Sequence, residues 1–388
     1  MLHFTSAGIR LFLMLVIILA AGFLHVSNSL CEAPKTETYL IIADTHLTKD
    51  TQDHAAMLEA VLQAAIGKSV VLFLGDNTNN AHTEEHTLVQ QWASSIEQIT
   101  GAEVYIIPGN HDYNAQIGPD EFRIQYSQYG WAQSFSHDTI SASYAVMTKN
   151  GVCLLLLDTN TFDNSNSVKS DGCIKGTTLV WLQQVLESLP NNTPVIAIGH
   201  HPILPLERDT RTPGASALSQ LLRAYGIGLY LCGHDHGFSI VEQDGLQQIT
   251  VGQPQNYPGW AGIIEKKDDG FLWYTKQIYD SQSSYYTALR EKAYSTGRIM
   301  AQGALVTTPY ADDEQAVDWF ATAYMMLIDS EMTPEKNAVL LRDENCLKWR
   351  KAETRTIVKE WMLNMLENCP KDVRQLYISL SQKHSLAY

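Results

Sequence analysis

The chain has 388 residues, of which 45% are hydrophobic and 18% are charged. This composition is typical of a globular protein with a large buried core, and it excludes a disordered tail or a collagen-like fibre. Its 27 Lys and Arg residues against 42 Asp and Glu residues give a formal net charge of −15. The acidic surplus argues against a nucleic-acid partner, because phosphate backbones are bound through Lys and Arg.

The N-terminus has the pattern of a secretory signal peptide. Arg10 precedes an apolar run of 14 residues, 11–24, which is shorter than the ~18–20 residues that a membrane-spanning helix needs. Ser27 and Ser29 then offer the small residues that a cleavage site requires. We therefore expect residues 1–29 to be a cleaved signal peptide and the mature protein to be secreted or extracytoplasmic, without a stable membrane span. An uncleaved anchor is the less favoured alternative.

Residues 38–280 alternate short apolar runs with helical periodicity. The runs at 39–43, 70–74, 104–108, 152–158, 195–199 and 228–232 predict strands, and the patterns at 54–66, 83–99, 177–189 and 215–225 predict helices between them. Most of these strands are apolar on both faces, as strands buried between two layers must be. The segments 260–267 and 271–279 flank an Asp-Asp-Gly turn and predict a β-hairpin. Together they predict an α/β domain with mixed sheets.

Beyond residue 284 the strand pattern gives way to helical periodicity. The segments 285–302, 313–330, 336–341, 347–366 and 373–382 predict helices. We therefore expect residues 285–388 to form a helical C-terminal subdomain.

Six cysteines are too few for a scaffold held together by disulfides, and their pairing is left open by the sequence. Cys153 at the start of a strand and Cys173 in a polar loop are the pair most easily joined. Cys346 and Cys369 would lie ~34 Å apart on an unbroken helix, so they can pair only if that helix breaks. Cys232, in an apolar strand, is expected to be a buried thiol.

Polar motifs follow five of the predicted strands directly. They are Asp44-Thr45-His46, Gly75-Asp76-Asn77, Gly109-Asn110-His111-Asp112, Gly199-His200-His201-Pro202 and Gly233-His234-Asp235-His236. Open α/β sheets build their sites at such strand ends. Carboxylate, imidazole and amide groups together suit a metal of intermediate hardness, such as Zn, Fe or Mn.

Each motif taken alone has an ordinary structural explanation. A single His after a strand is more often a structural residue than a ligand, and Asp76 alone could cap the loop that follows it. Six of the 13 His residues nevertheless fall inside the five motifs, each placed straight after an apolar run. This joint occurrence favours a metal site over coincidence.

The ordered set resembles the calcineurin-like metallophosphoesterase superfamily over residues 38–280. The resemblance implies two mixed β-sheets packed as a four-layer α/β/β/α sandwich with two divalent or trivalent metal ions at the strand ends. Transferred motif by motif, it assigns one metal ion to Asp44, His46, Asp76 and His236, and the other to Asp76, Asn110, His200 and His234. The bridging ligand would be Asp76.

The same resemblance implies a phosphoester hydrolase in which a metal-activated water attacks phosphorus in line. It makes His111 a catalytic acid outside the ligand set, oriented by Asp112. Asn110 and His111 would contact the substrate. We place His201 in the same substrate-binding group, although its role is left open because it is the residue between His200 and Pro202.

The sequence lacks residues that are typical of two branches of this family. The string Asn77-Thr78-Asn79-Asn80 lacks the Arg that protein Ser/Thr phosphatases carry there. Asn79 stands where purple acid phosphatases have a metal-binding Tyr, so the colour of an iron tyrosinate is not expected. What remains is the group of secreted phosphomonoesterases and phosphodiesterases, including those that resemble acid sphingomyelinase-like enzymes with added C-terminal helices. The expected partner is a small-molecule or lipid-like phosphoester.

Substrate choice is expected to lie in the rim loops 114–121, 203–214 and 253–260. Arg208 and Arg211 could hold an anionic part of the substrate, and Tyr257 and Trp260 could stack on a ring, although surface Arg and turn residues explain both pairs equally well. The alternative to an enzyme is a catalytically silent secreted scaffold that keeps the fold. Because scaffolds of this kind usually lose ligands and every ligand position is filled here, the enzyme is favoured.

Overall fold

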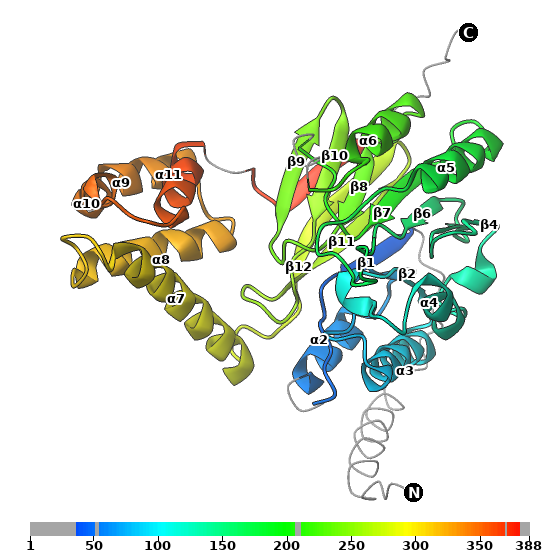
Figure 1. Cartoon of the computed structure of the whole chain (residues 1–388), viewed down its shortest axis with the longest axis horizontal. Coiled ribbons are helices and arrows are strands. Elements are labelled where there is room, and N and C mark those ends of the chain that lie inside the picture. The colour runs from blue at the N-terminus through cyan, green and yellow to red at the C-terminus, as the bar shows by residue number, and fades with distance from the viewer. Residues whose placement is uncertain (1–35, 51–53, 206–210, 369–370, 381–388) are drawn as a thin grey trace, which may run out of the picture. The chain divides into compact units, whose positions relative to one another are not determined.

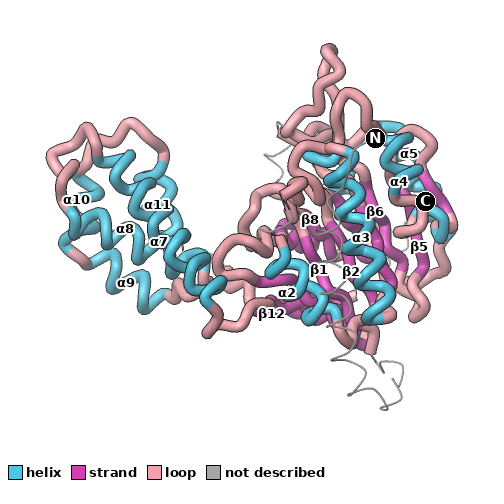
Figure 2. Tube along the Cα trace, turned by 90° about the horizontal axis from the view of Figure 1, so that it is seen from below, coloured by secondary structure: helices cyan, strands magenta, loops and turns pink. Residues whose placement is uncertain are grey.

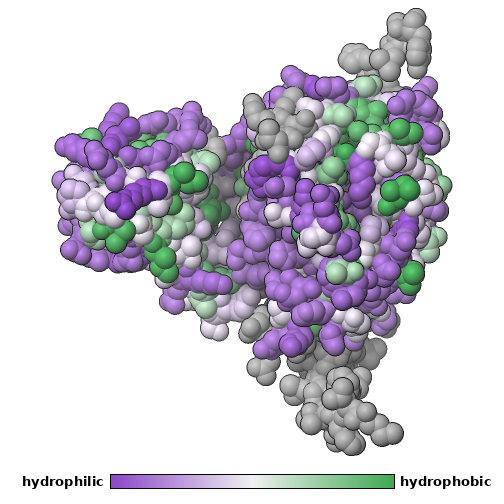
Figure 3. All heavy atoms as spheres, in the orientation of Figure 1, coloured by the Kyte–Doolittle hydropathy of each residue, from purple (hydrophilic) through white to green (hydrophobic). Residues whose placement is uncertain are grey.

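The computed structural model describes residues 36–380 except for 51–53, 206–210 and 369–370. The predicted signal peptide, Arg208 and Cys369 therefore lie outside the described residues. None of the helices in the described ranges is long and apolar enough to span a bilayer. The surface drawn in Figure 3 is mainly hydrophilic, with apolar side chains in small groups.

The first sheet has six strands in the order β13-β12-β11-β1-β2-β3. They are β1 (Thr38–Ile42), β2 (Val70–Phe73), β3 (Glu103–Ile106), β11 (Trp260–Lys267), β12 (Gly270–Gln277) and β13 (Gln375–Ser379). Strands β1, β2 and β3 run parallel, whereas β11, β12 and β13 are joined antiparallel. The β11–β12 pair confirms the predicted hairpin.

The second sheet has seven strands in the order β4-β5-β6-β7-β8-β10-β9. They are β4 (Ser136–His137), β5 (Tyr144–Met147), β6 (Cys153–Leu157), β7 (Val195–Gly199), β8 (Leu229–Cys232), β9 (Ser239–Gln243) and β10 (Leu246–Thr250). Strands β6, β7, β8 and β10 are parallel neighbours. Both sheets are therefore mixed, as predicted.

Three apolar cores hold the layers together. Along β1, Tyr39 and Ile41 pack into the core between the two sheets, while Leu40 and Ile42 face the helices, as the alternation of a strand requires. The helices α2 (Ala55–Ala65), α3 (Thr83–Thr100) and α4 (Pro119–Gln125) cover the first sheet, and α5 (Gly176–Ser188) and α6 (Ala215–Ala224) cover the second. Figures 1 and 2 thus show the predicted four-layer sandwich.

Five helices follow the core and share an apolar core of their own. They are α7 (Ser284–Leu305), α8 (Glu314–Ile328), α9 (Pro334–Arg342), α10 (Glu344–Lys351) and α11 (Val358–Asn368). We call residues 284–368 the helical region. Four of its helices are capped at the N-terminus by a side chain that accepts a hydrogen bond from a backbone N–H group. The capping residues are Ser283, Asp313, Thr333 and Asp343.

Two predictions about the C-terminal helices are wrong. The expected helix at 347–366 breaks between α10 and α11, where Trp349 is anchored to Ala316 and Lys359 donates to the Ala352 carbonyl. The expected helix at 373–382 is strand β13 as far as the structure describes it. Ile378 pairs with Phe271 and Leu376 pairs with Trp273. As a strand the segment packs its apolar side chains beside those of β12, and a helix at this position would not make these contacts.

The sequence left the cysteine pairing open, and the pair that it made easiest to join, Cys153 and Cys173, forms no disulfide. Cys153 begins β6, whereas the Cys173 N–H donates to Thr159, beyond the other end of that strand. At about 3.3 Å per residue the strand itself keeps the two sulfurs far apart. Cys232 is a buried thiol, as predicted, and Cys346 is a free, buried cysteine.

Candidate metal centre

The five polar motifs meet at one edge of the two sheets. Strands β1, β2, β3, β7 and β8 lead into Asp44, Asp76, Asn110, His200 and His234, respectively. Within the sheets, the Asp44 N–H donates to Gly75 and the Gly233 N–H donates to His200, both at 3.0 Å. Between the sheets, the His234 N–H donates to the two Asp44 carboxylate oxygens at 3.0 and 3.1 Å. The five motifs thus meet at the strand ends, where open α/β sheets build their sites.

The backbone at this edge is held in an unusual conformation. Asp44, His46, Asp76, His234 and His236 all have positive φ angles, between 41° and 71°. Such angles are sterically unfavourable for residues with a side chain and cost of order 1–3 kcal/mol each. Because the packed strands hold these turns, the side chains are aimed at a common point before any ligand binds.

Glycines in the motifs allow the loops to approach the acidic side chains. A Cβ atom on Gly109 would lie 2.2 Å from Asp76 Oδ1, and one on Gly233 would lie 2.6 Å from Asp44 Oδ2. No side chain fits at either position. These glycines are therefore required by the close packing of the strand ends.

One group of ligand candidates comprises Asp44, His46, Asp76 and His236. One ligand atom from each lies within 4.8 Å of all the others. The Nε2 atoms of His46 and His236 are 3.1 Å apart, and His236 Nε2 is 3.8 Å from Asp44 Oδ1. Residues 190 positions apart thus point two ring nitrogens at one small volume, as the predicted first ligand set requires.

The second predicted set continues from the same Asp76 carboxylate. Asp76 Oδ2 lies 3.7 Å from His46 Nε2 and 3.2 Å from His200 Nε2. His200 is fully buried, and its Nδ1–H donates a hydrogen bond to the Leu74 carbonyl at 2.9 Å. This hydrogen bond leaves Nε2 to face the site, an arrangement typical of a ligating histidine. Asp76 therefore stands between the two predicted sets.

Burial controls the protonation of these groups. It raises the pKa of Asp44 well above its usual range, although the charge of His200 offsets part of the effect. Burial would also raise the pKa of Asp76 and lower that of His200, but their mutual attraction dominates, so Asp76 stays well below its usual range and His200 rises to about 9. Asp76 is therefore ionised, which is the form in which a carboxylate binds a cation.

The imidazoles on either side of this pair are neutral near pH 7. Burial lowers the pKa of His46 to about 4 and that of His234 to about 3. Neutral imidazole is the form that binds a metal ion, since the ligand nitrogen must carry a free lone pair.

The donor set fits metal ions. Two nitrogen ligands of one ion, each at about 2.1 Å, lie about 3 Å apart, which is close to the separation of His46 and His236. Within the described part of the chain, the buried Asn110 Oδ1 has no hydrogen-bond partner. Since buried polar atoms are almost always satisfied, this oxygen fits the role of a metal ligand.

The ring of His111 lies beside the first group and is exposed. Its centroid is 4.7 Å from that of His46, and its Nδ1 is 2.8 Å from the Asn79 carbonyl. The backbone N–H of His111 donates to Asp76 Oδ1 at 2.7 Å. Because a carbonyl only accepts, Nδ1 carries the proton and Nε2 is left for a substrate.

The predicted role of Asp112 needs correction. Its buried carboxylate accepts the N–H groups of Asn77, Thr78 and Gly109, at 3.1, 2.8 and 2.8 Å, rather than the ring of His111. Asp112 therefore ties the loop after β2 to the loop after β3, and the Asn79 carbonyl orients the ring. Sequence reasoning missed Asn79 in this role, because a backbone carbonyl has no sequence signature.

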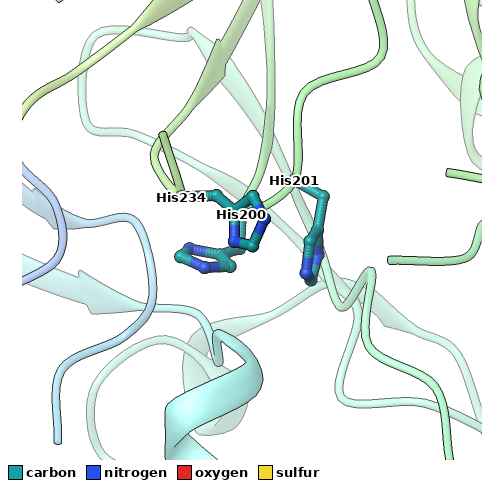
Figure 4. Close-up of side chains that lie close together, drawn as sticks. All are labelled: His200, His201 and His234. Carbon is teal, nitrogen blue, oxygen red and sulfur yellow. The ribbon is translucent and has the colours of Figure 1, made fainter. Parts of the chain in front are cut away.

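His201 is also misassigned as a substrate-binding residue. Figure 4 shows its ring beside those of His200 and His234, but it is 1% exposed. Its Nδ1 is 2.6 Å from the Thr159 hydroxyl and its Nε2 is 3.1 Å from the Ser170 carbonyl. With both nitrogens engaged, the ring forms the wall behind the ligands and anchors the 170–173 loop.

The rim residues are placed differently from one another. Arg211 lies 3.7 Å from Asp171, half exposed, and its charge contributes to the low pKa of His234. The Tyr257 hydroxyl donates to Asp329 at 3.0 Å, at the end of α8, and Trp260 packs on Phe238. Of the three rim side chains in the described part of the chain, only that of Arg211 carries a charge that acts on a ligand candidate.

Residues 38–238 match the family model of the calcineurin-like phosphoesterases. The match covers more than half of the chain, and the chain belongs to this family of metal-dependent hydrolases. The family predicted from the five motifs is therefore confirmed.

Relatives include both a diesterase and a phosphatase. A probable glycerophosphodiester phosphodiesterase GpdQ from Arcobacter nitrofigilis is 25% identical, with 55% of this chain and 77% of the relative aligned. Tartrate-resistant acid phosphatase type 5 from Rattus norvegicus is also 25% identical, over 61% of this chain and 77% of the relative. A crystal structure of a dimetal phosphatase from Danio rerio has the same fold, with a TM-score of 0.50, 16% identity and coverage of 63% of this chain and 97% of that one.

Proposed function

We propose that the chain hydrolyses phosphoesters at a centre of two metal ions. One ion would be held by Asp44, His46, Asp76 and His236, and the other by Asp76, Asn110, His200 and His234. The observation that carries this proposal is the position of Asp76 Oδ2, which lies 3.7 Å from His46 Nε2 and 3.2 Å from His200 Nε2. A carboxylate placed between two sets of ligands is what a shared centre requires.

When bound, the metal ions would polarise a water for in-line attack on phosphorus and neutralise the charge of the phosphoryl oxygens. Asp44 and Asp76 supply the anionic part of the shell. Asn110 supplies a neutral oxygen, which keeps the total negative charge of the shell low.

His111 is proposed as the residue that handles the proton of the leaving group. Its Nδ1–H is held by the Asn79 carbonyl, so the ring is fixed and Nε2 faces the substrate. A protonated Nε2 would donate to the leaving oxygen or to a phosphoryl oxygen, which are the tasks of a general acid and of an electrostatic stabiliser.

The first test is metal-dependent hydrolysis of two chromogenic substrates, p-nitrophenyl phosphate and bis-p-nitrophenyl phosphate. Both would be assayed with the protein as purified, after chelation, and after adding back Zn, Fe or Mn, with elemental analysis of the same samples. We expect activity that chelation removes and metal restores, and the ratio of the two rates identifies a monoesterase or a diesterase. Bound metal without hydrolysis of either substrate would favour the scaffold alternative.

We also propose that the protein acts outside the cytoplasm. The proposal is supported by the basic residue, the 14-residue apolar run and the small residues within positions 1–29. Expression of the full chain with its N-terminus intact, followed by mass spectrometry of the exported product, tests it. A mature chain beginning at Leu30 is expected, and an intact N-terminus in the membrane fraction would indicate an uncleaved anchor.

A further inference from the structure

A cavity of about 710 Å³ opens beside the metal centre. One part of its wall is the loop that follows β8, beginning with Asp235 and His236. The opposite part comes from α7, α8 and α11 of the helical region. In Figure 3 the surface is hollowed where these helices approach the core, and apolar side chains stand at that border. The volume lies within the range of about 300–1,000 Å³ that is usual for small-molecule sites.

The cavity and the metal centre share a side chain. His236 lines the cavity, and its Nε2 is 3.1 Å from His46 Nε2 in the first ligand group. The His46 ring in turn lies 4.7 Å, centroid to centroid, from the His111 ring. A group attached to a phosphorus atom at the centre therefore reaches the cavity without crossing an intervening layer of protein.

The helical side of the cavity is mostly apolar. Leu289, Tyr324, Met332, Trp361 and Met365 line it, and Phe238 lines the side of the core. Aromatic rings and flexible Met side chains accommodate alkyl or aryl groups of varied shape. Burial of hydrocarbon against such a wall is favourable, whereas a polar sugar would find few hydrogen-bond partners there.

The formal charges that line the cavity balance. Lys292 and Lys371 are basic, and Asp235 and Asp372 are acidic. The apolar wall, and not a surplus of charge, is therefore what distinguishes the cavity. The loop wall is braced against α8 by the hydrogen bond from the Tyr257 hydroxyl to Asp329.

We propose that this cavity binds an apolar alkyl or aryl group of the substrate, so that the enzyme prefers phosphoesters with a large hydrocarbon substituent. The inference rests on the proposed phosphoesterase function and adds the class of substrate. The helical region is then a specificity element, because it supplies the apolar wall while the core supplies the chemistry.

A series of substrates that differ only in chain length tests the proposal. The p-nitrophenyl phosphodiesters with a methyl, hexyl or decyl second ester group would be compared, together with methyl, hexyl and decyl phosphate, which cover a monoesterase. Burial of each methylene favours binding by about threefold to fourfold, so kcat/KM should rise at least about tenfold from methyl to hexyl. Concentrations stay below the onset of micelles.

Variants that fill the cavity separate this explanation from a general preference for hydrophobic molecules. Ala293 and Thr296 line the cavity from α7, whereas Ile299 on the same helix is 64% exposed and does not line it. Ala293→Trp and Thr296→Trp should remove the advantage of the decyl substrates and leave the methyl substrates unchanged. Ile299→Trp, the matched control, should behave as the wild type for the whole series.

A binding measurement keeps this test independent of turnover. Calorimetric titration of the metal-loaded protein with decyl phosphate should show tighter binding than methyl phosphate and a negative heat-capacity change, both reduced in Thr296→Trp. Equal kcat/KM across the series and equal binding of the two phosphates would overturn the inference while leaving the phosphoesterase proposal intact. Absence of metal-dependent hydrolysis of every substrate would instead count against the proposed function, and decyl phosphate binding would still decide whether the cavity takes hydrocarbon.

Discussion

At the strand-end edge of the core, five metal-ligand candidates have positive φ angles and charged groups are buried. In the helical region, by contrast, regular helices with capped starts pack around an apolar core. The edge lowers stability locally, because strain and buried charge both cost free energy. The helices add stability without any chemistry of their own. Substitutions in the two regions should therefore affect different quantities.

The largest expected effect is that of Asp76→Ala. This change removes the carboxylate that lies between His46 and His200, so both metal ions lose a ligand. Activity should fall by at least about 1,000-fold, since metal-ion stabilisation contributes several kcal/mol. Steady-state assay and elemental analysis of the same preparation measure the effect. Asp76→Asn keeps the shape of the side chain and separates loss of the ligand from loss of the fold.

Asp235→Asn is the matched control at this edge. Asp235 stands between His234 and His236 but is not a proposed ligand, so this variant should keep its metal. Metal addition should raise the Tm of the wild type and of this control, because a ligand present at 100 times its Kd stabilises by about 2.7 kcal/mol. The Asp76 variants should not respond. A full response in Asp76→Ala would contradict the shared-ligand assignment.

In the helical region, Trp349→Ala should act on stability alone. Trp349 is 1% exposed, packs on Phe320 and donates its Nε1–H to the Ala316 carbonyl at 2.9 Å. Its removal should cost about 3–5 kcal/mol, seen as earlier unfolding in urea, while the metal content of the folded protein stays normal. Leu347→Ala, at a position that is 52% exposed on the same helix, should be nearly neutral. Loss of metal from folded Trp349→Ala would show that the two regions are not independent.

His111→Ala is expected to have a smaller effect on activity than Asp76→Ala. Loss of a general acid lowers turnover by about 100-fold or more, and the metal ions should remain because His111 is not a ligand. The drop should lie in kcat and be smallest for substrates with a good leaving group, such as p-nitrophenolate. His137→Ala, another exposed histidine, serves as the control. Unchanged kcat with poor leaving groups would remove His111 from the mechanism.

The smallest expected effect lies at the other end of β1, where Glu37 is 4% exposed. Burial raises its pKa, and the Glu103 charge adds to the shift. Because the folded pKa lies above the unfolded one, stability from this group is fully present below about pH 4 and is lost as the pH rises through the folded pKa. Glu37→Gln, which stays neutral, should therefore raise the Tm at pH 7 by about 1–3 °C and have no effect below pH 4.

Thermal unfolding at several pH values measures this difference. Glu59→Gln changes an exposed carboxylate on α2 and should shift the Tm little at any pH. A Glu37→Gln variant that is less stable at pH 7 would mean that the charged form is favoured in the fold.

The ligand candidates could be predicted because they follow apolar runs of a recognisable kind. Parallel strands end at a common edge, so Asp44, Asp76 and His200 had to come close once their strands formed neighbouring layers. The sequence does not show in the same way which of His200 and His201 faces the site. Adjacent residues point to opposite sides of an extended backbone, and only the contacts of His201 with Thr159 and Ser170 show which ring is turned away.

The sequence of β13 contains an alternating pattern that is typical of a strand, although we interpreted the segment as a helix. Leu376, Ile378 and Leu380 alternate with polar residues at a spacing of two, which favours a strand. Its pairing with β12 connects residues about 100 positions apart, and no local pattern predicts such a partner. The helix break before α11 has the same origin, because Trp349 is fixed by α8 rather than by its own neighbours.

The sequence by itself determined the layers of the core, the set of polar residues at the strand ends and the family, since each is written in local periodicity and in short motifs. The tertiary structure alone decided the proton on His111 Nδ1, the withdrawal of His201 from the site and the apolar cavity beside His236. The physical reason is distance along the chain. His46 and His236 are 190 residues apart, and their contact depends on two sheets packing face to face, a long-range interaction that no local pattern encodes.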